Sequence, residues 1–96
     1  MTVTETTRST SFDPTGPWRL ADRVAVRDEA FGALAYHYGT RRLVFLKSRE
    51  LVALVRALPD FTSADEAVRA VVGADAIPRY RVALASLAAS GVLVAR

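Results

Sequence analysis

A period of two runs through residues 24–48, whose sequence is VAVRDEAFGALAYHYGTRRLVFLKS. Apolar and polar residues alternate over 24–27, an aromatic-rich run follows over 32–38, and a β-branched and aromatic run occupies 42–46. Alternation and these residue types are typical of half-buried strands, and Gly39 marks a turn. On the middle run, one face carries the larger side chains, Leu34, Tyr36 and Tyr38. We therefore expect three short strands joined as antiparallel hairpins.

After the third strand the period changes to that of a helix. Ser48 can cap a first helix, which Pro59 stops. Ser63-Ala64-Asp65-Glu66 matches a capping box, in which the serine and glutamate side chains satisfy each other's exposed amides. A second helix therefore begins here, and Gly73 closes it.

A third helix is predicted between Pro78 and Gly91. Proline fits the first turn of a helix, where its missing amide hydrogen costs nothing, and glycine commonly follows the last turn. Residues 92–94 are apolar and either pack back or extend the sheet. The predicted class is therefore α+β and winged helix-turn-helix-like, with a three-stranded antiparallel sheet followed by three helices.

The N-terminal residues differ in composition from the rest of the chain. Residues 1–17 are mostly Thr, Ser, Asp, Gly and Pro, which cannot supply enough apolar burial to offset the entropy of ordering them. Trp18 is the first large aromatic residue next to a strand pattern and is expected to be a packing anchor. We predict a disordered tail over 1–17 and one domain over 18–96.

Composition excludes several classes of protein. The chain has 96 residues and no cysteine, so disulfides, thiolate catalysis, iron–sulfur ligation and cysteine zinc sites are excluded. Charged residues interrupt every apolar stretch well before a membrane span, and no secretory signal is evident, so the cytoplasm is the expected compartment. The net charge is +3, and every basic residue except Lys47 is arginine, which pairs with carboxylates as well as phosphates.

No residue pattern predicts catalysis. His37 is the only histidine, and neither further metal ligands nor a positioned catalytic partner is visible beside it. Phosphate-binding glycine patterns are missing as well. We expect a protein that is not an enzyme and that has no catalytic residue, no cofactor and no metal.

DNA binding is the first alternative that the predicted layout raises. In a winged helix-turn-helix domain, the last helix needs polar, base-reading side chains near its start. Arg79 and Arg81 could serve, but the rest of that helix is rich in Ala and Leu and suits apolar contact. A DNA-binding transcriptional regulator is therefore the second hypothesis.

Peptide capture on a strand edge is the other use of this layout. Unpaired amides and carbonyls on an edge strand can bind an extended peptide as a further strand. The middle of the third strand is apolar, and Arg42 and Lys47 make both of its ends cationic. This arrangement suits a peptide with apolar anchors and acidic flanks. Core packing explains only one face of this strand; the other needs a second covering layer.

Two stretches carry a specific family resemblance, Arg-Asp-Glu-Ala-Phe-Gly at 27–32 and Tyr-His-Tyr-Gly-Thr-Arg-Arg at 36–42. With the surrounding residues 24–48, they resemble the mycofactocin biosynthesis chaperones (MftB), a family of PqqD-like peptide-recognition domains, also called RiPP recognition elements. The resemblance covers roughly residues 18–96, with no departure from the family pattern.

The resemblance implies a peptide chaperone without catalysis of its own. It would bind the leader of a ribosomally made, MftA-like precursor and present it to an MftC-like radical SAM maturase, which carries the iron–sulfur clusters and S-adenosylmethionine. No nucleic acid or membrane partner is implied. The leader would add beside the third strand, in the groove toward the third helix. The implied peptide-binding residues are Arg42, Leu43, Val44, Phe45, Leu46, Lys47, Arg79, Tyr80, Ala83, Leu84 and Leu87.

Overall fold

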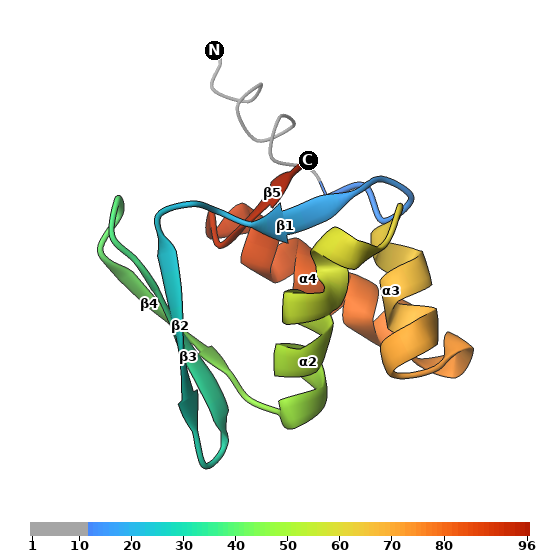
Figure 1. The fold of residues 1–96 in the computed structure, drawn as a ribbon, viewed down its shortest axis with the longest axis horizontal. Coiled ribbons are helices and arrows are strands. Elements are labelled where there is room, and N and C mark those ends of the chain that lie inside the picture. Colours follow the sequence, from blue (N-terminus) through green and yellow to red (C-terminus); the bar gives the residue numbers. More distant parts are fainter. Residues whose placement is uncertain (1–11) are drawn as a thin grey trace.

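The computed structural model of the protein describes residues 12–96. In chain order (Figure 1) the elements are β1 (Trp18–Leu20), β2 (Val24–Glu29), β3 (Gly32–His37), β4 (Arg42–Leu46), α2 (Arg49–Ala57), the 3₁₀ turn η1 (Leu58–Asp60), α3 (Ala64–Val71), the 3₁₀ turn η2 (Ala74–Ala76), α4 (Ile77–Ala89) and β5 (Leu93–Ala95). A three-stranded antiparallel sheet precedes three α-helices, which confirms the predicted α+β class. Residues 1–11 of the predicted tail lie outside the described residues.

The sheet has the order β2-β3-β4, and α2 packs against one of its faces. In the central strand Ala35 pairs with Val26 on one side and Val44 on the other. Ala33 and Ala35 have no exposed surface and belong to the core. Because alanine is small, α2 can lie close to the sheet, which leaves the larger side chains of β3 on the outward face.

Serine side chains cap α2 and α3, as the sequence predicts. Ser48 Oγ accepts from the Leu51 amide (3.0 Å), and Ser63 Oγ accepts from the Glu66 amide (3.1 Å). The capping box is formed only in part, because the Glu66 carboxylate instead accepts a hydrogen bond from the neighbouring Thr62 hydroxyl (2.6 Å). At α3, the serine half of the predicted capping box is therefore formed and the glutamate half is not.

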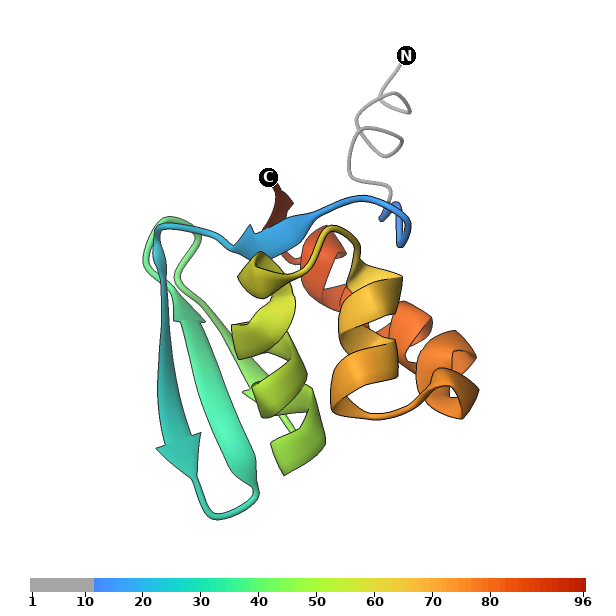
Figure 2. The same cartoon turned by 45° about the vertical axis from the view of Figure 1, so that its right-hand side comes forward.

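Three layers surround the core. Figure 2 shows α2 between the sheet and the other two helices, and α2 contacts both β3 and α3. The largest side chains with almost no exposed surface come from all three layers and from the C-terminal segment: Leu46, Leu54, Leu58, Leu84, Leu93, Val55, Val68 and Val92. The domain therefore has one continuous core.

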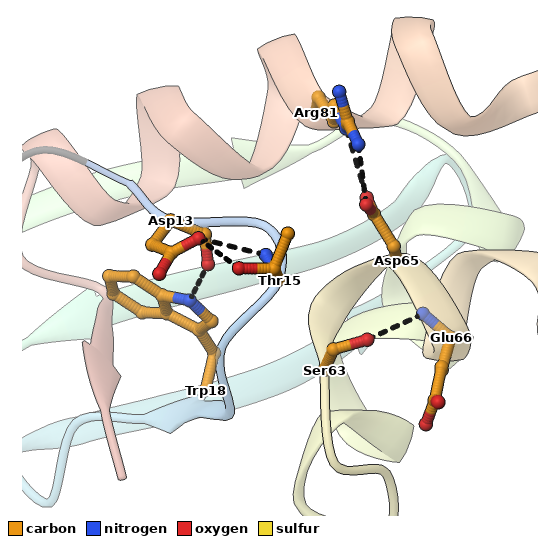
Figure 3. A network of polar contacts seen from close by, with 7 residues as sticks. All are labelled: Asp13, Thr15, Trp18, Ser63, Asp65, Glu66 and Arg81. Carbon is orange, nitrogen blue, oxygen red and sulfur yellow. Dashed lines mark hydrogen bonds and ion pairs between the residues drawn. The ribbon is translucent and has the colours of Figure 1, made fainter.

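The segment 12–17 lies against this core, with Phe12 packed on it. The Trp18 indole N–H donates to the Asp13 carbonyl (2.7 Å; Figure 3), and the Phe12 and Trp18 ring centroids are 4.9 Å apart. Hydrogen bonds from the Thr15 hydroxyl and amide lower the pKa of the Asp13 carboxyl. The packed region thus extends N-terminal of Trp18, where the sequence placed its start.

The segment 12–17 is held in place because its carbonyls accept hydrogen bonds from the free backbone amides at the start of α3. The first two amides of the helix donate to the carbonyls of Gly16 and Pro14, each at 3.0 Å. The first amides of a helix have no partner within the helix, so these carbonyls complete the cap that Ser63 begins. Composition could not reveal this, since backbone carbonyls make the contacts.

The C-terminal residues form a second, separate sheet. β5 pairs antiparallel with β1, with Trp18 opposite Ala95 and Leu20 opposite Leu93. Of the two outcomes left open for residues 92–94, the structure shows packing back: Val92 and Leu93 are buried, and β5 does not extend the three-stranded sheet.

Candidate functional site

β4 is an edge strand of the three-stranded sheet. Within residues 12–96 it pairs only with β3, so its outer edge has no strand partner. An edge of this kind presents a row of backbone N–H and C=O groups to an incoming extended chain.

The register shows which residues present these groups. The Tyr38 amide donates to the carbonyl just before β2 (2.7 Å), so Tyr38 turns its backbone toward β2. Because backbone polar groups alternate in direction along a strand, Ala35 faces β4, and its partner Val44 bonds back to β3. Leu43 and Phe45, one position to either side of Val44, therefore direct their N–H and C=O groups to the open edge.

The other edge of the sheet, β2, is less suited to pairing. It carries Arg27, Asp28 and Glu29 among its six residues, and Asp28 forms an ion pair with Arg56 of α2 (3.1 Å). Arg27 also donates to Glu29 (2.7 Å). Charged side chains on an edge oppose the addition of another strand, so the β4 edge is better suited to strand addition than the β2 edge.

The two faces of β4 have different surroundings. Val44 is half-buried and Leu46 is fully buried on the face toward α2, whereas Leu43 and Phe45 are 53% and 54% exposed on the other face. Leu46 is thus part of the core and can only shape the strand, whereas Leu43 and Phe45 can touch a bound peptide directly.

Cationic residues stand at both ends of β4, as predicted. Arg42 and Lys47 are exposed, and neither forms an ion pair with any residue that the structure describes. Arg41, in the preceding turn, is also exposed and has a positive φ of 62°. An extended ligand on this edge would therefore meet positive charge at each end.

The predicted residues of α4 fall into two groups. Tyr80, Leu84 and Leu87 are buried in the core, whereas Ala83 is half-buried and Arg79 is exposed. Arg79 stacks on its own neighbour, with the guanidinium carbon 5.1 Å from the Tyr80 ring centroid. The three buried side chains therefore position the helix and offer no contact surface.

α4 approaches the sheet by its C-terminal end. Figures 1 and 2 both show its first turn, in orange, on the far side of the helices from the sheet, and its last turn, in red, nearer to it. A side chain at Gly91 would contact the His37 ring at 3.6 Å, so the helix end lies beside the end of β3. The structure thus brings the end of α4 to the sheet but not its first turn with Arg79.

The two arginines considered for reading DNA bases differ in their contacts. Arg81 forms two hydrogen bonds with Asp65 of α3 (3.0 and 2.5 Å; Figure 3), and this interaction raises the pKa of Arg81. Arg79 carries no ion pair among the described residues. Arg81 thus holds α3 and α4 together and is not available to read bases, whereas Arg79 has no comparable contact among the described residues.

Two exposed aromatic residues of the sheet were absent from the predicted set. Phe31 and Tyr38 are large, exposed and on the outward side of the sheet, beside Leu43 and Phe45. The sequence contained a signal for Tyr38, which shares the face of larger side chains with Leu34 and Tyr36, and Phe31 belongs to the motif at 27–32. No helix in the described part of the chain is long and apolar enough to cross a membrane.

Comparisons with known proteins agree with the motif resemblance. Residues 17–94 match the model of the peptide chaperone MftB family. Relatives named "Peptide chaperone MftB" include that of Mycobacterium tuberculosis, 49% identical over 92% of this chain and 82% of the relative. Those of Mycobacterium ulcerans (50%, over 88% of this chain and 78% of the relative) and Mycolicibacterium smegmatis (46%, 95% and 90%) are similar. No solved structure matches significantly.

Proposed function

Because this chain belongs to the peptide chaperone MftB family, we propose that it binds the leader of a mycofactocin-type precursor peptide along β4 and presents that peptide to a radical SAM maturase. The protein itself performs no chemistry. It holds the peptide by strand addition, and the core of the precursor stays free for the enzyme.

The observation that carries this proposal is the pair of outward-facing backbone positions, Leu43 and Phe45. Strand addition gives affinity through main-chain hydrogen bonds, and neighbouring side chains select the sequence. β4 offers both, since its backbone faces outward at Leu43 and Phe45 and their side chains are half exposed. The other edge carries charges that oppose pairing.

Charge at the ends of the strand sets the preferred ligand. Arg42 and Lys47 flank the apolar middle of β4, so acidic residues near the ends of the leader's binding segment would be favoured. Ala83 is half-buried on α4 and packs against the core, and α2 lies between α4 and the sheet (Figure 2), so a leader on the β4 edge would not reach it. Arg79 belongs to the first turn of α4, and that turn lies on the far side of the helices from the sheet (Figures 1 and 2), so we do not expect Arg79 to contact the leader in this arrangement.

The absence of cysteine fits a division of labour between two proteins. A thiolate-ligated iron–sulfur cluster needs cysteine, and this chain has none. The maturase would therefore hold the clusters and bind S-adenosylmethionine, while this chain supplies recognition.

Leader binding tests the proposal directly. Arg42→Glu should weaken the binding of a synthetic mycofactocin leader about fivefold, because an exposed ion pair contributes up to roughly 1 kcal/mol. Arg79→Glu is the matched control, with the same charge change away from β4, and should alter affinity less than twofold. Calorimetric titration at physiological salt measures both.

A duplex DNA arm distinguishes the second hypothesis. Phosphate-driven binding falls steeply as salt rises, whereas strand pairing should change little. Tight DNA binding with that salt dependence, weakened by Arg79→Glu and without leader binding, would show a regulator instead of a chaperone.

A further inference from the structure

The outward face of the three-stranded sheet is unusually apolar. Five large hydrophobic residues of the described chain are substantially exposed, and four of them gather on this side: Phe31 (46%), Tyr38 (57%), Leu43 (53%) and Phe45 (54%). The fifth, Val82, lies on α4. Contiguous apolar surface on a small domain marks an interaction site, because water contact with it is unfavourable.

The side chains of this face form an ordered surface. Phe31 and Phe45 have ring centroids 5.7 Å apart, and Tyr36 and Tyr38 meet edge to face at 4.9 Å. A hollow of about 560 Å³ lies on this face, and the residues that line it include Ala25, Arg27, Leu34, Tyr36, Tyr38 and Leu43. We call this surface the outer sheet face; it is formed by Ala25, Arg27, Phe31, Leu34, Tyr36, Tyr38, Leu43 and Phe45.

A leader bound at the β4 edge leaves most of the outer sheet face open. Neighbouring strands lie about 4.8 Å apart, so an added strand would be about 10 Å from β3 and about 15 Å from β2. Its side chains can reach the row of Leu43 and Phe45, but Tyr36 and Ala25 lie one and two strands further on. Most of the face thus needs a different occupant, one broad enough to span three strands.

The charges around the outer sheet face define that occupant. Strand alternation places Arg23, Arg27 and Lys47 on or beside this face, with Glu29 as the one carboxylate in the same rows, already bonded to Arg27. A second copy of the chain would oppose cations to cations across the interface. Charge complementarity therefore requires a partner with carboxylates around an apolar patch.

We infer that the outer sheet face is the docking surface for the enzyme that receives the peptide, a folded protein with an apolar patch bordered by carboxylates. This inference rests on the proposed function, in which that enzyme is the radical SAM maturase. Since the face adjoins the β4 edge, enzyme and leader can bind the chain at the same time. The bound leader then lies directly beside the enzyme.

A double variant at the two ends of the outer sheet face tests this inference. Phe31→Ser with Tyr38→Ser removes two exposed aromatic residues that lie away from the edge backbone. Aromatic residues that become buried on binding are enriched among the residues that dominate interface affinity, so binding to the purified maturase should weaken at least tenfold. Leader affinity should stay within twofold of the original. Val82→Ser is the control, because it removes an exposed hydrophobic residue elsewhere, and it should leave both affinities unchanged.

Each result separates the inference from the proposed function. Maturase binding that survives in the double variant, with the leader still bound normally, overturns the docking surface alone. A parallel loss of leader affinity would place the face within the leader site and also overturn the inference. If the original chain binds leader but no maturase, presentation itself fails. Sedimentation that shows a dimer of the original chain and a monomer of the variant would assign the face to a second copy.

Discussion

Replacing Gly32 with alanine should destabilise the domain by roughly 3–5 kcal/mol, a large share of the total for a domain of this size. Gly32 has a φ of +149°, and a Cβ there would overlap with the Leu46 carbonyl oxygen. That oxygen belongs to the backbone, so the end of β4 would have to move away from β3. Strain at such a φ costs about 1–3 kcal/mol, and overpacking adds a similar amount. Urea denaturation monitored by circular dichroism measures the loss.

Gly73 offers a matched control for this substitution. Its φ of +139° is close to that of Gly32, but a Cβ added there would have no neighbour within 4 Å. Gly73→Ala should therefore show the backbone strain alone, about 1–3 kcal/mol. Equal losses at both glycines would mean that β4 does not approach β3 as closely as described.

Proline substitutions at adjacent positions of β4 should have different effects, one on leader binding and the other on the stability of the domain. Phe45→Pro removes an amide that faces the open edge, so the fold should persist while leader binding weakens about 30-fold. This corresponds to about 2 kcal/mol for a lost hydrogen bond and an unsatisfied carbonyl on the leader. Val44→Pro removes an amide that bonds to β3, so it should destabilise the domain itself by at least about 2 kcal/mol.

Two further variants keep this test interpretable. Phe45→Ala retains the amide and removes only the ring, so it should bind the leader much better than Phe45→Pro. Leu43→Pro repeats the amide test at the other outward position in case Phe45→Pro fails to fold. Equal binding losses for Phe45→Ala and Phe45→Pro would show that the ring, not the backbone, holds the leader. Normal binding by a folded Leu43→Pro would contradict strand addition here.

Local signals in the sequence were sufficient for most elements. Ser48 and Ser63 mark helix starts because their side chains satisfy free amides, and Pro59 and Gly73 mark ends for equally local reasons. The strands likewise follow from alternation bounded by short turns. Such signals depend on residues close together in the chain, which is why they can be recognised without tertiary structure.

Long-range features could not be predicted in the same way. β1 and β5 are short and lie near opposite ends of the described sequence, so no local pattern in either strand indicates that it pairs with the other. The buried face of β3 was also undetermined: Leu34 and Tyr36 have more apolar area than Ala33 and Ala35, yet the alanine face is buried. Close packing of α2 decided that choice, and it exposed the aromatic face.

The candidate site was predictable in part for related reasons. The residues of β4 and the charges at its ends could be named from the sequence, but their division between core and surface depends on which face α2 covers. Arg79 was named because the family resemblance implies a leader groove that runs from the third strand toward the third helix. Instead, the helix approaches the sheet by its last turn, an orientation that residue spacing does not encode.

Amide hydrogen exchange of the chain with and without leader tests the central claim most directly, because it reports each backbone position of β4 separately. Strand addition at the β4 edge predicts that the Leu43 and Phe45 amides exchange rapidly in the free chain and become protected when the leader is bound. The Val44 and Leu46 amides, which face β3, should be protected in both states. Unchanged exchange at Leu43 and Phe45 at saturating leader, with new protection confined to β2 or α4, would contradict capture of the peptide on this edge.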